Sequence, residues 1–271
     1  MADNGATSAR IAMIGCGNLG SAIVQRWLSS ATLTVDQLTA CTAREHTSQQ
    51  LARTLGIACS TDLARTLASA DVAVLAFKPQ QRALLLPRLA ALPQRPLWIS
   101  LLAGVPLAEL QATLGGRVVR WMPNTPVAVG AGMVAQCTTA AVGADDLTTC
   151  AQLLRPLGAS LGLAEAQFDA FTAVAGCGPA YVFAFCEALA AAATAQGLDE
   201  ATAGEIARQT MIGAAQLLAV SSEPMAVLRQ QVTSKGGMTE AALASLGAQH
   251  WAGVLDQAVA AAVAQAKQLR A

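Results

Sequence analysis

The chain has 271 residues, of which 54% are hydrophobic and 13% charged, and its 17 basic residues balance 17 acidic ones. A neutral chain without a basic cluster is a poor candidate for binding nucleic acid or an anionic membrane surface. Only two histidines are present, so a histidine base or a histidine-rich metal site is not expected. Proline and glycine interrupt the longest uncharged stretches, which argues against a transmembrane helix.

The N-terminal segment and the cysteines indicate the compartment. Residues 1–9 are small and polar, lack the apolar core of a signal peptide, and are interpreted as a flexible tail. Seven cysteines, an odd number without a Cys-x-x-Cys pair, are typical of small buried residues in a reducing compartment. The sequence therefore predicts a cytoplasmic protein.

A glycine motif follows this tail directly. An apolar run over 10–14 ends in Gly15-x-Gly17-x-x-Gly20, and an amphipathic segment begins at Ser21. The order is that of a strand, a tight turn and a helix. In dinucleotide-binding domains the first glycine permits the turn, the second lets the backbone approach a pyrophosphate, and the third lets the helix pack on the strand. We expect a bound dinucleotide, and a purely structural glycine turn is the alternative.

The end of the second predicted strand indicates which dinucleotide binds. Backbone N–H groups at the start of the new helix, from Asn18 and Leu19, would face the phosphates. NAD sites carry a carboxylate at the end of the next strand for the ribose 2′-hydroxyl, but here Thr42 and Arg44 occupy that region. A cation and a hydroxyl would attract a 2′-phosphate, which predicts NADPH, with NADH as a second cofactor. A solvated surface arginine is the alternative for Arg44.

Strand and helix patterns alternate through residues 10–164. Strands are predicted at 37–42, 57–60, 71–77, 96–102 and 117–122, and helices at 45–55, 63–68 and 79–92. Two further segments, 131–138 and 161–163, extend the sheet at one edge. The run at 71–77 is apolar on both faces, as a central buried strand should be. This alternation predicts an α/β domain with a doubly wound, mostly parallel sheet of the Rossmann type.

The pattern changes at about residue 165, after which no strand is predicted. Helices are expected at 178–196, 199–220, from 222 onward, at 238–246 and at 250–269. Their alanine and leucine residues lie on more than one face, which favours burial against a second subunit over a lone bundle. We therefore predict an NADP-binding domain over 10–164 and an all-helical dimerisation and substrate domain over 165–271.

Three local motifs indicate the rest of the site. Phe-Lys-Pro-Gln (77–80) leaves the central strand at its carboxyl end, where ligands bind in such sheets. Met-Pro-Asn-Thr-Pro (122–126) closes another strand, and a loop rich in glycine and hydroxyl groups (233–240) leads into a helix. The free backbone N–H groups of that loop suit a small carboxylate. For Lys78 and Asn124, a structural role is an equally good interpretation.

Together with Gly-Cys-Gly-Pro-Ala-Tyr (176–181), these motifs resemble those of the pyrroline-5-carboxylate reductases, which make proline in the last biosynthetic step. The resemblance runs from about residue 10 to the end of the chain. It implies that NADPH transfers a hydride to C5 of 1-pyrroline-5-carboxylate, with release of L-proline. It also implies a homodimer through the C-terminal helices that associates into a larger ring, such as a decamer.

The resemblance also implies site residues. The substrate carboxylate would bind Ser234 and the backbone N–H groups of Gly237 and Met238, and the hydroxyl of the catalytic residue Thr239 would face the ring nitrogen. Glu165 matches an acidic position near the family's substrate, and a solvated glutamate is the alternative. The implied cofactor contacts come from Gly15, Gly17, Asn18, Leu19, Gly20, Thr42, Arg44, Phe77, Lys78 and Ala103.

The chain departs from the family pattern at several positions. The loop commonly reads Ser-Pro-Gly-Gly-Thr-Thr, whereas here Lys235 and Met238 replace the proline and the first threonine. Cys177 replaces a serine, and Leu63 stands where many relatives have an asparagine near the adenosine. The lost hydroxyl at position 238 leaves open a related imine or β-hydroxyacid reductase with a different small carboxylate substrate. A regulatory protein that binds NADPH without turnover is a third interpretation.

Overall fold

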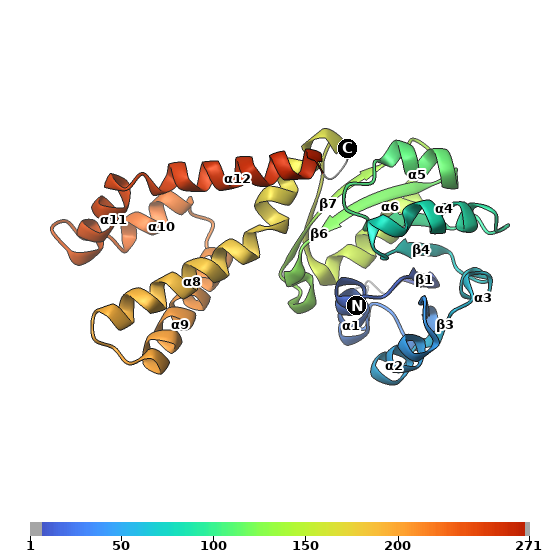
Figure 1. The fold of residues 1–271 in the computed structure, drawn as a ribbon, viewed down its shortest axis with the longest axis horizontal. Helices are drawn as coiled ribbons and strands as arrows, with labels where there is room; N and C mark the ends of the chain where they lie inside the picture. Colours follow the sequence, from blue (N-terminus) through green and yellow to red (C-terminus); the bar gives the residue numbers. More distant parts are fainter. Residues whose placement is uncertain (1–6, 269–271) are drawn as a thin grey trace. The chain divides into compact units, whose positions relative to one another are not determined.

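A computed structural model describes residues 7–268 (Figure 1). The greater part of the predicted tail at 1–9 lies outside the described residues. The chain divides into two compact units. The first reaches to Gly176 and includes the end of the last helix from Val263, and the second spans Cys177–Ala262.

The first unit is built on an eight-stranded sheet with the order β3-β2-β1-β4-β5-β6-β7-β8. The strands are β1 (Ile11–Ile14), β2 (Leu38–Cys41), β3 (Ala58–Ser60), β4 (Val72–Leu75), β5 (Leu97–Ser100), β6 (Val118–Pro123), β7 (Gly132–Thr138) and β8 (Gly158–Gly162). Neighbouring strands are parallel except for β6 and β7. The strand order reverses between β1 and β4, which creates the crevice where doubly wound sheets bind ligands. The predicted doubly wound sheet, including its two edge strands, is confirmed.

Six helices accompany this sheet (Figure 1). They are α1 (Asn18–Ser29), α2 (Glu45–Leu55), α3 (Leu63–Leu67), α4 (Arg82–Ala90), α5 (Leu107–Leu114) and α6 (Ala144–Leu154). Helix α1 begins three residues before the predicted start, because the backbone of Gly17 is its N-cap. Helices α5 and α6 were not predicted from the sequence.

Alternation along the strands divides the core into two layers. In β1, Ile11 and Met13 pack with α1, α2 and α6, whereas Ala12 and Ile14 pack with α3, α4 and α5. Successive strand residues point to opposite faces, so a strand covered on both sides is apolar throughout. All four residues of β4 are buried. This confirms the prediction that the apolar run at 71–77 forms a central buried strand.

The second unit contains helices and, within the described residues, no strand. Its helices are α8 (Gly178–Ala195), α9 (Glu200–Val220), α10 (Met225–Gln231), α11 (Met238–Ala248) and the greater part of α12 (Trp251–Gln268). As predicted, the Asp199 carboxylate caps α9, accepting a hydrogen bond from the Thr202 N–H at 3.0 Å. A short helix, α7 (Phe168–Phe171), and a π-helical turn (Thr172–Gly176) precede α8 and belong to the first unit.

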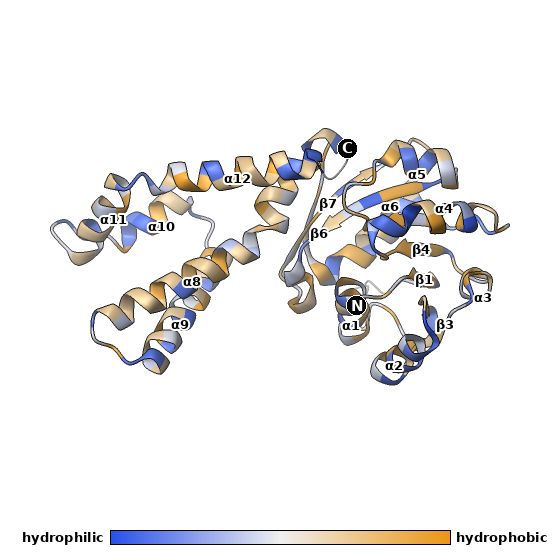
Figure 2. Ribbon diagram, viewed as in Figure 1, coloured by the Kyte–Doolittle hydropathy of each residue, from blue (hydrophilic) through white to orange (hydrophobic). Residues whose placement is uncertain are grey.

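Apolar side chains of the second unit lie on its surface, and Figure 2 shows hydrophobic residues along α8 and α9. Phe183 is 63% exposed and Leu217 is equally exposed. Among the described residues, one helical stretch, Glu165–Ala195, is long and apolar enough to cross a membrane by length and composition alone. Exposed apolar surface on this scale marks a surface that another molecule covers.

Candidate active site

Gly15 lies where the carboxyl ends of three strands meet. Its φ angle is +81°, and a Cβ atom there would lie 2.7 Å from the backbone nitrogen of Phe77. Its own N–H donates to the Cys41 carbonyl at 2.8 Å, which ties the end of β1 to the end of β2. A side chain at position 15 would therefore require both a strained backbone and a displaced β4.

The start of α1 is an open, positively polarised helix end. Gly17 is the N-cap, and no side chain of a described residue caps the helix in its place. A Cβ atom at Gly17 would meet nothing within 4 Å, whereas one at Gly20 would touch Ala76 and Met13 at 3.4 Å. The backbone donors of Asn18 and Leu19 are thus left for a ligand. A pyrophosphate fits such an end, because N–H groups and the helix dipole both favour an anion.

The end of β2 contains an exposed cation on a fixed turn. The buried Thr42 hydroxyl donates to the Arg44 carbonyl at 3.0 Å and lies 2.7 Å from the Ser48 hydroxyl. Arg44 is exposed, and its side chain has no hydrogen bond or ion pair within residues 7–268. The Thr42 hydroxyl therefore supports the turn, and the Arg44 guanidinium is the group free to bind an anion.

The remaining predicted cofactor residues follow the next two strands. Phe77 is 9% exposed and comes two residues after β4, and the exposed Lys78 is the N-cap of a short 3-10 helix. Ala103 is exposed in the loop between β5 and α5. Each predicted cofactor residue thus follows the carboxyl end of β1, β2, β4 or β5, which is the ligand-binding edge of such a sheet.

The predicted substrate loop forms the start of α11 in the second unit. Gly237 is the N-cap, and no described side chain caps α11. The Glu240 carboxylate folds back to accept a hydrogen bond from the Gly236 N–H at 2.7 Å. Ser234 and Thr239 are exposed, and the Met238 side chain is 91% exposed. The Gly237 N–H donates to the Ser234 carbonyl at 3.0 Å. The loop therefore offers two hydroxyl groups and, beyond Gly237, the backbone donors of the helix end, beginning with the Met238 N–H.

Glu165 belongs to the first unit and is already engaged there. Its Oε1 accepts a hydrogen bond from Arg120 Nη1 at 2.6 Å and another from the Leu107 N–H at 2.7 Å. The sequence analysis did not single out Arg120, although a lone arginine inside an apolar strand is a visible signal for a buried ion pair. The structure thus groups Glu165 with the first unit and the predicted substrate-binding loop with the second.

Asn124, from the motif at 122–126, has a structural role. Its Nδ2 donates to the Ala175 carbonyl at 2.9 Å, and its Oδ1 accepts from the Met133 N–H at 2.8 Å. Both ends of the amide are therefore used to join the end of β6 to β7 and to the π-helical turn. This accounts for the motif without a ligand.

Two partly or fully buried cysteines are held in the thiol form. Burial raises the pKa of Cys137 to about 11 and that of Cys150 to about 12, so these thiols stay protonated at neutral pH. Within the described part of the chain, no group of three His, Cys, Asp or Glu side chains is arranged to hold a metal ion.

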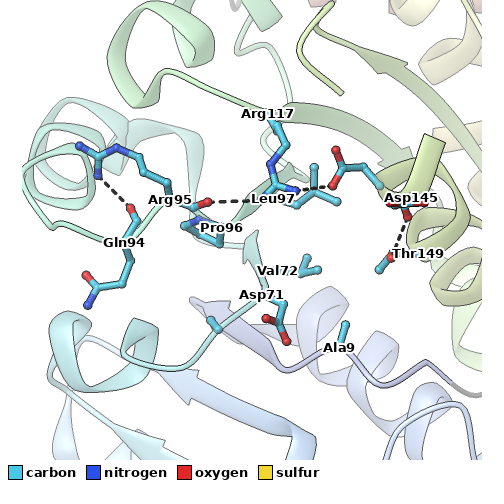
Figure 3. Close-up of a pocket in the computed structure, with 12 residues that line it drawn as sticks. Ala9, Asp71, Val72, Gln94, Arg95, Pro96, Leu97, Arg117, Asp145 and Thr149 are labelled. Atoms are coloured by element: carbon cyan, nitrogen blue, oxygen red, sulfur yellow. Dashed lines mark hydrogen bonds and ion pairs between the residues drawn. The ribbon is translucent and has the colours of Figure 1, made fainter. Parts of the chain in front are cut away.

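A cavity of about 400 Å³ lies at the opposite edge of the sheet (Figure 3). It is lined by residues at the amino ends of β1, β4, β5 and β6, among them Asp71 and Arg117. Asp146 pairs with Arg117 at 2.6 Å and accepts from the Gly143 N–H at 3.0 Å, and Asp71 accepts from the Arg10 N–H at 2.8 Å. Among the described residues, Gln94 Oε1 on the same lining is buried without a partner. The cavity lies at the edge of the sheet away from the glycine turn and from Arg44, so it is not the cofactor site.

The fold and the first unit's donor set define a class of protein. A doubly wound sheet with an uncapped glycine-turn helix and a free arginine after β2 is a nicotinamide-dinucleotide-binding oxidoreductase domain. Two family models match the chain: "NADP oxidoreductase coenzyme F420-dependent" over residues 10–104, and "Pyrroline-5-carboxylate reductase dimerisation" over residues 165–269. A curated pyrroline-5-carboxylate reductase from Pseudomonas aeruginosa is 38% identical over 96% of this chain and 96% of its own length. The chain belongs to the pyrroline-5-carboxylate reductase family.

Solved structures agree with this assignment. A pyrroline-5-carboxylate reductase from Coxiella burnetii matches with a TM-score of 0.91 and 31% identity, covering 98% of this chain and 100% of that one. A Plasmodium falciparum pyrroline carboxylate reductase with NADP bound matches with a TM-score of 0.83 and 25% identity, with the same coverage. The resemblance stated from the sequence motifs is confirmed, and it spans both units.

Proposed function

We propose that this protein reduces 1-pyrroline-5-carboxylate to L-proline with NADPH, the last step of proline biosynthesis. The observation that carries the proposal is the similarity to pyrroline-5-carboxylate reductases over nearly the whole chain, 96% of it in the Pseudomonas aeruginosa relative. A cyclic imine needs no strong base, because protonation of its nitrogen makes the neighbouring carbon a good hydride acceptor. The scarcity of histidine agrees with this chemistry.

The cofactor would bind along the carboxyl edge of the sheet. Backbone donors of Asn18, Leu19 and Gly20 would hold the pyrophosphate, for which the open space beside Gly17 leaves room. Arg44 would bind the 2′-phosphate and select NADPH, with Thr42 fixing its turn. The cofactor, when bound, supplies the hydride that reduces C5 of the imine. The remaining contacts would come from Phe77, Lys78 and Ala103.

The substrate would bind at the start of α11. The Ser234 hydroxyl and the Met238 N–H would hold its carboxylate at the uncapped helix end. The Gly237 N–H would join them by leaving the Ser234 carbonyl, to which it donates at 3.0 Å. The Thr239 hydroxyl would donate a hydrogen bond to the ring nitrogen. C5 takes the hydride from the cofactor, and the nitrogen takes one proton from the solvent, so the threonine is left unchanged. Thr239 is thus the proposed catalytic residue. One oxygen of the Glu165 carboxylate, Oε1, is engaged with Arg120 and the Leu107 N–H, and the side chain is 32% exposed. These two contacts support a positioning role for Glu165 in place of direct substrate binding.

The assembly and the compartment belong to the same proposal. The functional division would fall at residue 165, where the match to the dimerisation family begins. We propose a homodimer formed through the C-terminal helices. Several such dimers would associate into a larger ring, such as a decamer. A second copy would cover the apolar faces of α8 and α9, including the stretch long enough to span a membrane. Balanced charge and reduced cysteines support a cytoplasmic enzyme that binds neither membrane nor nucleic acid.

One assay tests the reaction directly. NADPH oxidation by the purified protein should depend on 1-pyrroline-5-carboxylate and yield proline, and the reverse reaction should run with proline at high pH. Thr239→Ala should lower kcat by about a hundredfold with NADPH binding unchanged, because loss of one positioned hydrogen-bond donor costs on that order. The matched control is Thr233→Ala, whose hydroxyl is committed to the Arg229 carbonyl at 2.7 Å. Equal activity of the Thr239 variant and the parent would remove Thr239 from catalysis.

The second candidate is an imine or β-hydroxyacid reductase with another small carboxylate substrate. Met238, 91% exposed at the start of α11 in place of a hydroxyl residue, favours it. The ratio of kcat/KM for 1-pyrroline-5-carboxylate to that for piperideine-6-carboxylate decides between them. A ratio far below one would replace the proposed substrate.

A further inference from the structure

A buried ion pair occupies the middle of β6. Arg120 is only 3% exposed, although arginine is rarely buried without a partner. Its Nη1 lies 2.6 Å from Glu165 Oε1, and its guanidinium carbon lies 4.6 Å from the centre of the Phe168 ring. Its Nε has no hydrogen-bond partner among the described residues. The charge of Arg120 therefore depends on Glu165 for compensation, with the Phe168 ring as a second contact.

The same carboxylate oxygen also caps a helix. The Leu107 N–H, at the first residue of α5, donates to Glu165 Oε1 at 2.7 Å. The preceding N-cap is Pro106, which has no side chain able to accept a hydrogen bond. Glu165 thus supplies, from 58 residues away, an acceptor for one of the backbone N–H groups that the start of a helix leaves unpaired.

A short loop connects the start of α5, which Glu165 contacts, to the carboxyl end of β5 at the predicted cofactor site. The loop between β5 and α5 covers residues 101–106 and contains Ala103, which is exposed at the carboxyl edge of the sheet. The loop has one end fixed in β5 and the other at Leu107. Its conformation depends on where the first turn of α5 is held, and Glu165 holds that turn against Arg120.

We infer that Arg120 and Glu165 form a positioning pair that sets the β5–α5 loop for the nicotinamide cofactor, and that Glu165 does not contact the substrate. The inference rests on the proposed function for the identity of the cofactor. Phe168, 1% exposed against Met122 and Ala135, fixes the segment that carries Glu165. The pair therefore joins the start of the dimerisation-family region to the cofactor edge within the first unit.

Glu165→Ala tests the inference in the full-length protein. Amides in the peptide 101–108 should exchange hydrogen about tenfold faster, and the NADPH dissociation constant from fluorescence titration should rise about five- to tenfold. The KM for 1-pyrroline-5-carboxylate at saturating NADPH should change less than about twofold. A general loss of stability would instead raise exchange throughout the sheet.

Two further variants keep the test decisive. The neutral double variant Arg120→Met with Glu165→Gln retains an acceptor for Leu107 without a buried charge, and should restore NADPH affinity to within about twofold of the parent. Asp146→Ala is the matched control, since Asp146 also pairs with an arginine at 2.6 Å and caps a helix start, but at the opposite edge of the sheet. It should leave NADPH binding unchanged.

The results separate this inference from the proposed function. A tenfold rise in the substrate KM of Glu165→Ala with unchanged NADPH binding and unchanged exchange at 101–108 would overturn the positioning role and return Glu165 to the substrate site. If the parent protein binds NADPH but does not reduce 1-pyrroline-5-carboxylate, the proposed function fails. The exchange and titration results still decide the positioning role in that case.

Discussion

The two units of this chain differ in where their apolar side chains lie. In the first unit, Trp98 is 1% exposed, and the sheet is covered on both faces by helices of the same chain. In the second unit, only Ala203 and Ala207 are buried among the described residues, and Phe183 is 63% exposed. A doubly wound sheet closes its own core, whereas a layer of apolar helices needs a partner. This difference is the reason to propose that the cofactor site is built within one chain and that the helical unit depends on assembly.

The largest effect expected from this comparison is the loss of assembly. Phe183→Glu on α8 would place a charge in the surface that a second copy covers, and should weaken association by about a thousandfold. Light scattering at micromolar concentration should then report a monomer, and reductase activity should fall with it.

Leu84→Glu provides the matched control. Leu84 on α4 is also 63% exposed but belongs to the unit that closes its own core. Its substitution should leave mass and activity unchanged. A parent chain that is already monomeric, or a Phe183 variant that still dimerises, would break the comparison.

The second prediction concerns two glycines that act differently within the first unit. Gly15→Ala should lower the free energy of unfolding by about 3 kcal/mol, because it adds left-handed backbone strain and a clash with β4. Gly17→Ala should change that free energy by less than about 1 kcal/mol, since its Cβ meets no protein atom. It should nevertheless raise the NADPH dissociation constant at least about tenfold by occupying the pyrophosphate space. Denaturant titration and fluorescence titration measure the two effects.

Gly143→Ala controls for the loss of a glycine N-cap. Gly143 caps α6 with a similar extended backbone, and its Cβ would meet only the Asp146 carboxylate at 3.9 Å. The variant should bind NADPH like the parent. Normal NADPH binding by Gly17→Ala would mean that the start of α1 does not hold the phosphates.

The fold could be predicted further than the site, for a physical reason. Strand and helix periodicity is local, so the sheet, its apolar central strand β4 and the helical second half could be predicted from the sequence. The missed helix α6 had local signals as well, with Asp145 and Asp146 in its first turn. By contrast, the contact between Arg120 and Glu165 joins residues 45 positions apart. No local sequence pattern reveals that Glu165 contacts Arg120 and Leu107. Its predicted place near the substrate therefore depended on the family resemblance alone.

The Thr42 hydroxyl is a second case in which the sequence predicted the residue but not its contacts. Residue types near the end of β2 predicted an environment suited to a 2′-phosphate, and they identified Arg44. They did not reveal that the Thr42 hydroxyl is turned inward to the Arg44 carbonyl and Ser48. A composition of polar residues predicts what a turn attracts, whereas the direction of each hydroxyl depends on tertiary packing.

The last prediction concerns cofactor choice, which we propose depends on the first unit alone. Arg44→Asp should raise the NADPH dissociation constant about 10- to 100-fold and that of NADH less than about threefold, because only NADPH loses a charge-assisted contact and gains repulsion. Arg53→Asp is the matched control, as Arg53 is an exposed arginine at the other end of α2. Fluorescence titration with both cofactors measures the ratio. An equal loss for NADPH and NADH would show that Arg44 supports the turn and does not read the 2′-phosphate. Since Arg44 lies wholly within the first unit, the ratio should be the same in the Phe183→Glu monomer as in the assembled protein.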